Sequence, residues 1–126
     1  MRKKNSKCEF ASQRHESLLK NFRASLAQQS VISARRAFED AVNAPAPRFW
    51  VTEARATRVI SMLLKGVDLT EGMLPEKRRM YLEILRRVKE RLDRTPEVPL
   101  GDIVFDVVNS EAPCAYMSPE TVKKIL

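Results

Sequence analysis

Apolar residues recur every three or four positions in four separate segments of this 126-residue chain, and this spacing limits the fold more than any other feature. It places one apolar face of an α-helix against a core, whereas a half-buried strand would need strict alternation. The segments run from about 12 to 28, from Ser33 or Ser30 to Asn43, from Thr52 to Gly66 and from Pro75 to about 94. Two shorter helices are expected at about 100–108 and 119–126. The sequence therefore predicts an all-α fold: a compact single helical domain of five or six helices over residues 11–126.

Prolines, glycine and small polar residues mark where these helices begin and end. Pro45 and Pro47 push the residues before them into extended conformations, so no helix crosses residues 44–51. Thr52 is a good N-cap for the third helix, as Ser33 or Ser30 is for the second. We expect Asn43 and Gly66 to end the second and third helices in left-handed conformations.

Two similar corners appear when Asp40 is aligned with Asp106, an alignment that we call the corner register. Residues 40–47 (DAVNAPAP) and 106–113 (DVVNSEAP) are then identical at five of eight positions, and Trp50 and Thr52 align with Tyr116 and Ser118. Each corner has the order helix, Asn-x-x-Ala-Pro, aromatic segment, helix. Either a unit was duplicated, giving copies at about 31–60 and 97–126, or two corners converged on the same capping chemistry. Duplication predicts that segments 48–51 (RFWV) and 114–117 (CAYM) lie close in space, for example as short paired strands.

Positive charge is concentrated in two segments of the chain. Residues 1–25 contain seven basic and two acidic side chains, and residues 77–94 contain eight basic and three acidic ones. Residues 95–126 contain two basic and five acidic side chains, and the net charge of the chain is +7. This asymmetry favours an anionic partner, either nucleic acid or an acidic protein surface.

Our first hypothesis is a small non-enzymatic protein that associates with nucleic acid through phosphate contacts. The contacts would come from a flexible basic arm over residues 1–10, from the first helix and from the helix at 75–94. The candidate residues are Arg2, Lys3, Lys4, Lys7, Arg14, Arg23, Lys77, Arg78 and Arg86. Against this, Glu83 and Glu90 lie four residues from arginines, so part of the pattern is also typical of a solvated helix stabilised by ion pairs.

The alternative hypothesis is a protein-interaction or assembly module without nucleic-acid binding. It would be a homo-oligomer if the basic helix met the acidic C-terminal quarter of another copy. Arg48, Phe49, Trp50 and Tyr116 combine aromatic and guanidinium groups of the kind that anchor interfaces. Aromatic residues just before a helix also commonly fill a core, and both interpretations remain open from the sequence.

Several classes of protein are disfavoured by the composition. Cys8 and Cys114 have no CxxC partner and His15 is the single histidine, so we expect neither a metal site nor a catalytic site. Three glycines do not make a glycine-rich phosphate loop, and no cofactor is expected. No apolar run reaches the roughly 18 residues of a membrane span. No apolar segment follows the basic start, so we expect a cytoplasmic protein.

Overall fold

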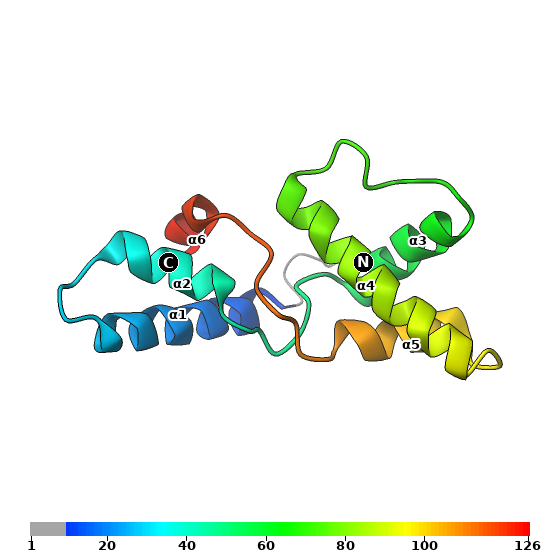
Figure 1. Ribbon diagram of the computed structural model, residues 1–126, viewed down its shortest axis with the longest axis horizontal. Helices are drawn as coiled ribbons and strands as arrows, with labels where there is room; N and C mark the ends of the chain where they lie inside the picture. Colours follow the sequence, from blue (N-terminus) through cyan, green and yellow to red (C-terminus); the bar gives the residue numbers. More distant parts are fainter. Residues whose placement is uncertain (1–9) are drawn as a thin grey trace, which may run out of the picture.

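Six helices and no strands make up residues 10–126, the part of the chain that the computed structural model describes (Figure 1). The helices are α1 (Ala11–Gln28), α2 (Ala34–Asn43), α3 (Glu53–Leu64), α4 (Pro75–Arg94), α5 (Leu100–Val108) and α6 (Pro119–Ile125). The all-α prediction is confirmed, and the predicted helices, with Ser33 as the cap of the second, agree with the observed ones to within about two residues at each end. The predicted contacts Arg2, Lys3, Lys4 and Lys7 lie outside the described residues.

Local capping explains these boundaries. The hydroxyl oxygens of Ser33 and Thr52 accept the backbone N–H groups three residues later, each at 3.2 Å. Ser118 does the same at the start of α6, again at 3.2 Å. The prediction for Asn43 is wrong: it is the last residue of α2, and the helix ends because Ala44, which precedes a proline, is extended with φ −78° and ψ 153°.

The helices pack as two groups of three, and each group takes one helix from the other half of the chain (Figure 1). α2 contacts α1 and α6, whereas α5 contacts α4 and α3. Thus α3 follows α2 in sequence but packs against α5, and α6 follows α5 but packs against α2. The two corners cross in the middle of the molecule, and neither group is complete without the other half.

Backbone hydrogen bonds between equivalent positions of the corner register hold this crossing. The N–H of Ala46 donates to the carbonyl of Ala112 at 2.9 Å, and the N–H of Ala112 donates to the carbonyl of Ala46 at 2.8 Å. Two further bonds are equivalent to each other in the same register, each at 2.9 Å: Phe49 N–H to the Val108 carbonyl, and Ala115 N–H to the Val42 carbonyl. The hydrogen bonding between the corners therefore has an approximate two-fold symmetry.

The corner register extends beyond the two corners and also aligns α1 with α4. Extended along the chain, it aligns Leu18, Leu19, Phe22 and Leu26 on α1 with Ile84, Leu85, Val88 and Leu92 on α4. The segments RFWV and CAYM lie close, as predicted, because the rings of Phe49 and Tyr116 stack with centroids 6.0 Å apart. The predicted strand pair is absent from these two segments, and the isolated bridge between the corners joins Ala46 to Ala112, just before them. An origin by duplication stays a prediction.

One continuous core runs through the molecule, with buried residues from all six helices and both corners. Phe49 is 0% exposed and Trp50 is 8% exposed. Both rings therefore fill the core and are not displayed to a partner, which corrects their proposed role as surface anchors. Phe10, at the end of the predicted arm, is also buried and lies 5.8 Å from Trp50 between ring centroids.

Candidate functional site

A cleft of about 550 Å³ opens where the two halves of the chain meet, and we call it the central cleft. Six pairs of equivalent positions in the corner register line it: Phe10 and Glu76, Arg14 and Met80, Trp50 and Tyr116, Val51 and Met117, Thr52 and Ser118, and Arg55 and Thr121. Because both members of each pair are present, the cleft lies on the approximate two-fold axis. Its volume is within the range of small-molecule sites, roughly 300–1,000 Å³.

Basic side chains from three helices gather at the central cleft. Arg14 of α1, Arg55 of α3 and Lys77 of α4 line it. The guanidinium of Arg79 lies 6.0 Å from the ring of Tyr116, a lining residue. Glu76 is the one carboxylate among the described lining residues. Arg14 and Lys77 belong to the two basic segments of the sequence, so the fold brings those segments to the same cleft.

Two buried N–H groups in the wall of the cleft are unpaired. Arg14 Nε and Trp50 Nε1 have no hydrogen-bond partner among the described residues. An unsatisfied buried donor destabilises a protein by about 1–3 kcal/mol. Burial also lowers the pKa of Arg14, although an arginine remains protonated at physiological pH. Both groups are therefore donors without an acceptor in the described part of the chain, and neither N–H is exposed in the cleft.

Tyr116 breaks the two-fold symmetry of the cleft. Its φ of 57° lies in the left-handed region, which no other non-glycine residue within 10–126 adopts. Such backbone conformations are costly for a bulky residue and cluster at binding sites. Burial raises the pKa of the Tyr116 phenol, so the side chain is neutral at physiological pH.

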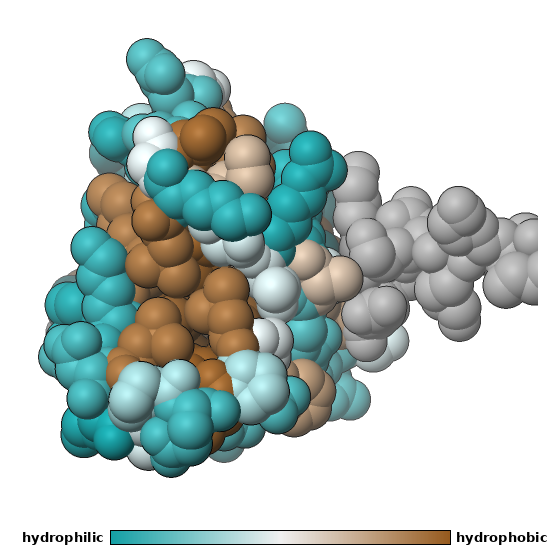
Figure 2. Space-filling model, turned by 90° about the vertical axis from the view of Figure 1, so that its right-hand side faces the viewer, coloured by the Kyte–Doolittle hydropathy of each residue, from teal (hydrophilic) through white to brown (hydrophobic). Residues whose placement is uncertain are grey.

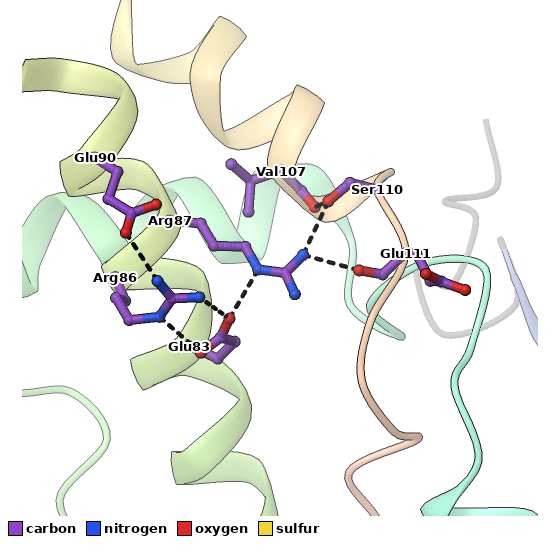
Figure 3. Close-up of polar contacts among 7 residues, drawn as sticks. All are labelled: Glu83, Arg86, Arg87, Glu90, Val107, Ser110 and Glu111. Atoms are coloured by element: carbon purple, nitrogen blue, oxygen red, sulfur yellow. Dashed lines mark hydrogen bonds and ion pairs between the residues drawn. The ribbon is translucent and has the colours of Figure 1, made fainter. Parts of the chain in front are cut away.

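The basic face of α4 is largely occupied by contacts within the chain (Figure 3). Arg86 donates to Glu83 at 2.7 Å and to Glu90 at 2.9 Å. Arg87 donates to Glu83 at 2.8 Å and, across to the second corner, to the Glu111 carbonyl at 2.8 Å. Hydrogen bonds from Arg86 and then Arg87 lower the pKa of Glu83. Arg86, a predicted phosphate contact, is thus bound by two carboxylates.

Two other predicted residues also have partners inside the molecule. The guanidinium of Arg78 lies 3.4 Å from the carboxylate of Asp68. Arg48 donates from Nε to the Phe49 carbonyl at 2.9 Å and lies 5.2 Å from the centre of the Phe10 ring. Arg48 therefore stabilises the first corner through contacts within the chain.

The structure brings together only part of the predicted site. Arg14, Lys77, Trp50 and Tyr116 line the central cleft. Arg23 is exposed on α1, and its backbone is about 13 Å further along the helix axis than that of Arg14.

Sequence reasoning missed Arg55 and Arg79 as site residues. Arg55 lies three residues after the helix cap Thr52. No local pattern distinguishes it, because only the packing of α3 against the opposite half places it at the cleft.

An apolar surface lies on the end of the molecule formed by α3, α4 and α5 (Figure 2). Large apolar side chains on these helices that remain exposed are Leu64, Leu82 and Phe105, of which Phe105 is 53% exposed. Because most large apolar side chains are buried on folding, a contiguous surface of this kind is typical of an interaction site.

No protein-family model matches the chain, and comparisons with curated proteins and with solved structures find no significant match. Within residues 10–126, no helix is both long and apolar enough to cross a membrane. The described part of the chain also has no group of three His, Cys, Asp or Glu side chains placed to hold a metal ion. Functional inference therefore rests on the cleft and the surfaces described above.

Proposed function

We propose that this protein associates with nucleic acid through phosphate contacts at the central cleft and is not an enzyme. The observation that carries the proposal is that Arg14 and Lys77, from the two separate basic segments, line one cleft. Had the two segments occupied opposite faces, one continuous footprint would have been impossible. Arg55 and Arg79 extend the same cationic surface, and guanidinium and ammonium groups are the usual phosphate contacts.

The point where the N-terminal segment joins the fold supports the same footprint. Residues 1–9 contain four basic side chains and one acidic one, and they connect directly to Phe10 in the wall of the cleft. Nine residues span at most about 30 Å. Arg2, Lys3, Lys4 and Lys7 are therefore tethered within reach of any phosphate backbone at the cleft.

Some basic side chains of the described residues form ion pairs with carboxylates of the chain, and others do not. Arg78, Arg86 and Arg87 pair with carboxylates, so breaking those pairs would offset part of the gain from a phosphate contact. Arg55, Lys77 and Arg79 form no ion pair with the described residues. Each phosphate that these side chains neutralise adds about 0.9 to the slope of log affinity against log salt concentration on duplex DNA.

The test is fluorescence anisotropy with short single- and double-stranded DNA and RNA over about 50–300 mM salt. The Arg55→Gln/Lys77→Gln variant should bind more weakly, with a slope shallower by about two. A chain lacking residues 1–8 should also show a shallower slope.

The matched control is Lys89→Gln/Arg94→Gln. It removes the same charge from residues that do not line the cleft, so it should leave the slope nearly unchanged. Absence of binding at the lowest salt concentration, or equal losses in the two double variants, would contradict the proposal.

A second candidate function is self-assembly through the apolar surface of α3, α4 and α5 (Figure 2). These helices also carry exposed charges of both signs, including Lys89 and Arg94 on α4 and Asp102 on α5, which is compatible with a contact between two identical surfaces. Sedimentation equilibrium should then show a dimer that Leu82→Ser/Phe105→Ser converts to a folded monomer. A wild-type monomer at high concentration would exclude this function.

A further inference from the structure

The central cleft is symmetric in position but not in chemistry. The first half of the chain contributes Arg14, Trp50 and Arg55, which offer only hydrogen-bond donors, two of them on cationic groups. The equivalent residues from the second half are Met80, Tyr116 and Thr121, all of them uncharged. The first half therefore presents a cationic, donating wall. The second half presents Tyr116, Met117 and Thr121, together with the opposite charges of Glu76 and Lys77.

The donating wall lacks acceptors. Trp50 is more than nine-tenths buried, yet its Nε1 has no partner within residues 10–126, and the same is true of Arg14 Nε. Nearly all buried donors in native proteins are paired, so two unpaired donors in residues of one cleft need an explanation. A ligand oxygen at this wall would be attracted by the positive charges of both arginines.

The opposite wall offers contact area to an apolar group. The half-buried side chains of Tyr116 and Met117 supply this area, whereas Met80 and Tyr81 are only 5% and 1% exposed. Methionine side chains adapt readily to the shape of a bound group. Tyr116 has a left-handed backbone, the strained conformation that marks binding sites more often than plain turns.

We infer that the central cleft binds a small amphipathic anion, in which an oxyanion such as a carboxylate, phosphate or sulfonate is joined to an apolar body. The oxyanion faces Arg14 and Arg55, and the apolar body lies against Tyr116 and Met117. The inference is independent of nucleic-acid binding. A stacked nucleobase is a poorer occupant, since Phe10 and Trp50 are only 7% and 8% exposed and leave little free ring face.

The test uses a pair of fluorescent probes with the same fused and pendant rings. One is 8-anilinonaphthalene-1-sulfonate, an amphipathic anion, and the other is N-phenyl-1-naphthylamine, which lacks the sulfonate. Trp50 is the single tryptophan of the chain, so energy transfer from Trp50 detects a bound probe, and the variants below locate it. The anionic probe should saturate one site with strong transfer, and the neutral probe should bind at least about tenfold more weakly.

Matched variants locate the oxyanion. Arg55→Gln should weaken the anionic probe by about tenfold, because a charge-assisted hydrogen bond is lost, and should leave the neutral probe unchanged. Arg58→Gln removes the same charge one turn further along α3, outside the cleft lining, and should have little effect. Phe105→Ser should lower any binding to the apolar end of the molecule without changing the energy transfer from Trp50.

Three results would overturn the inference: no energy transfer from Trp50, equal affinity for the two probes, or equal losses in Arg55→Gln and Arg58→Gln. Failure of nucleic-acid binding alone would leave it standing, because probe binding is measured without nucleic acid. An oligonucleotide that binds without displacing the anionic probe would contradict the proposed nucleic-acid site at the cleft and would leave this inference standing.

Discussion

α1 and α4 occupy equivalent places in the two halves of the chain and carry matching apolar stripes, but they use their charged side chains differently. On α4, Arg86, Arg87 and Arg91 all form ion pairs, and Arg91 reaches Asp106 on α5. On α1, Lys20 and Arg23 form no ion pair with the residues that the structure describes. α4 carries eight basic side chains and α1 carries three, but half of those on α4 are paired with carboxylates. Four of the eight basic side chains of α4 therefore stabilise the fold, whereas Lys77, Arg79, Lys89 and Arg94 form no ion pair within residues 10–126.

The two corners differ in the same way. Phe49 of the first corner is fully buried, stacks on Tyr116 and lies 5.0 Å beneath the guanidinium of Arg87. The equivalent position in the second corner is Ala115. A single large ring, from the first corner, therefore fills the space between both corners. The backbone hydrogen bonds are symmetric, but the side-chain packing is not.

The largest expected effect comes from removing that ring. Phe49→Ala should lower the free energy of unfolding by about 3–5 kcal/mol, because it leaves a cavity between the halves. Ala115→Gly, at the equivalent position, should cost about 1 kcal/mol. Urea unfolding of both variants measures the difference. Similar losses would show that the corners share the packing equally.

A smaller effect is expected from the arginine that connects α4 to the second corner. Arg87→Met keeps much of the apolar stem but loses the hydrogen bonds to Glu83, Ser110 and the Glu111 carbonyl. It should lower the free energy of unfolding by about 1.5 kcal/mol. Its neighbour Arg86 pairs only with groups on α4 itself, so Arg86→Met should shift the urea midpoint much less. A larger loss in Arg86→Met than in Arg87→Met would contradict the conclusion that Arg87 stabilises the fold more than Arg86 does.

The smallest expected effect concerns the two equivalent helix caps. Thr52→Ala and Ser118→Ala each remove a side-chain acceptor for a backbone N–H at 3.2 Å, and each should cost about 1 kcal/mol in the same unfolding assay. Equal losses would support the equivalence of the corners. A loss confined to Thr52→Ala would show that α6, at the end of the chain, contributes little to the cooperative fold.

The sequence by itself determined the helices and the location of the corners. The signals that define the helices act over only a few residues, so they can be identified from the sequence without the tertiary structure. They are the periodic apolar residues, the caps Thr52 and Ser118, Pro45 and the left-handed Gly66. The likeness of the two corners also predicted that their aromatic segments lie close together. The error at Asn43 arose where two local signals competed and the following Ala-Pro dominated.

Only the tertiary structure decided which helices share a core and which charges share a surface. An apolar stripe specifies that a face is buried but not which helix covers it, so the exchange of α3 and α6 between the halves is not encoded in periodicity. That exchange places Arg55 beside Arg14 and Lys77, and it buries Trp50. The central cleft therefore exists because long-range backbone pairing sets the two corners across each other, an arrangement that no window of neighbouring residues contains.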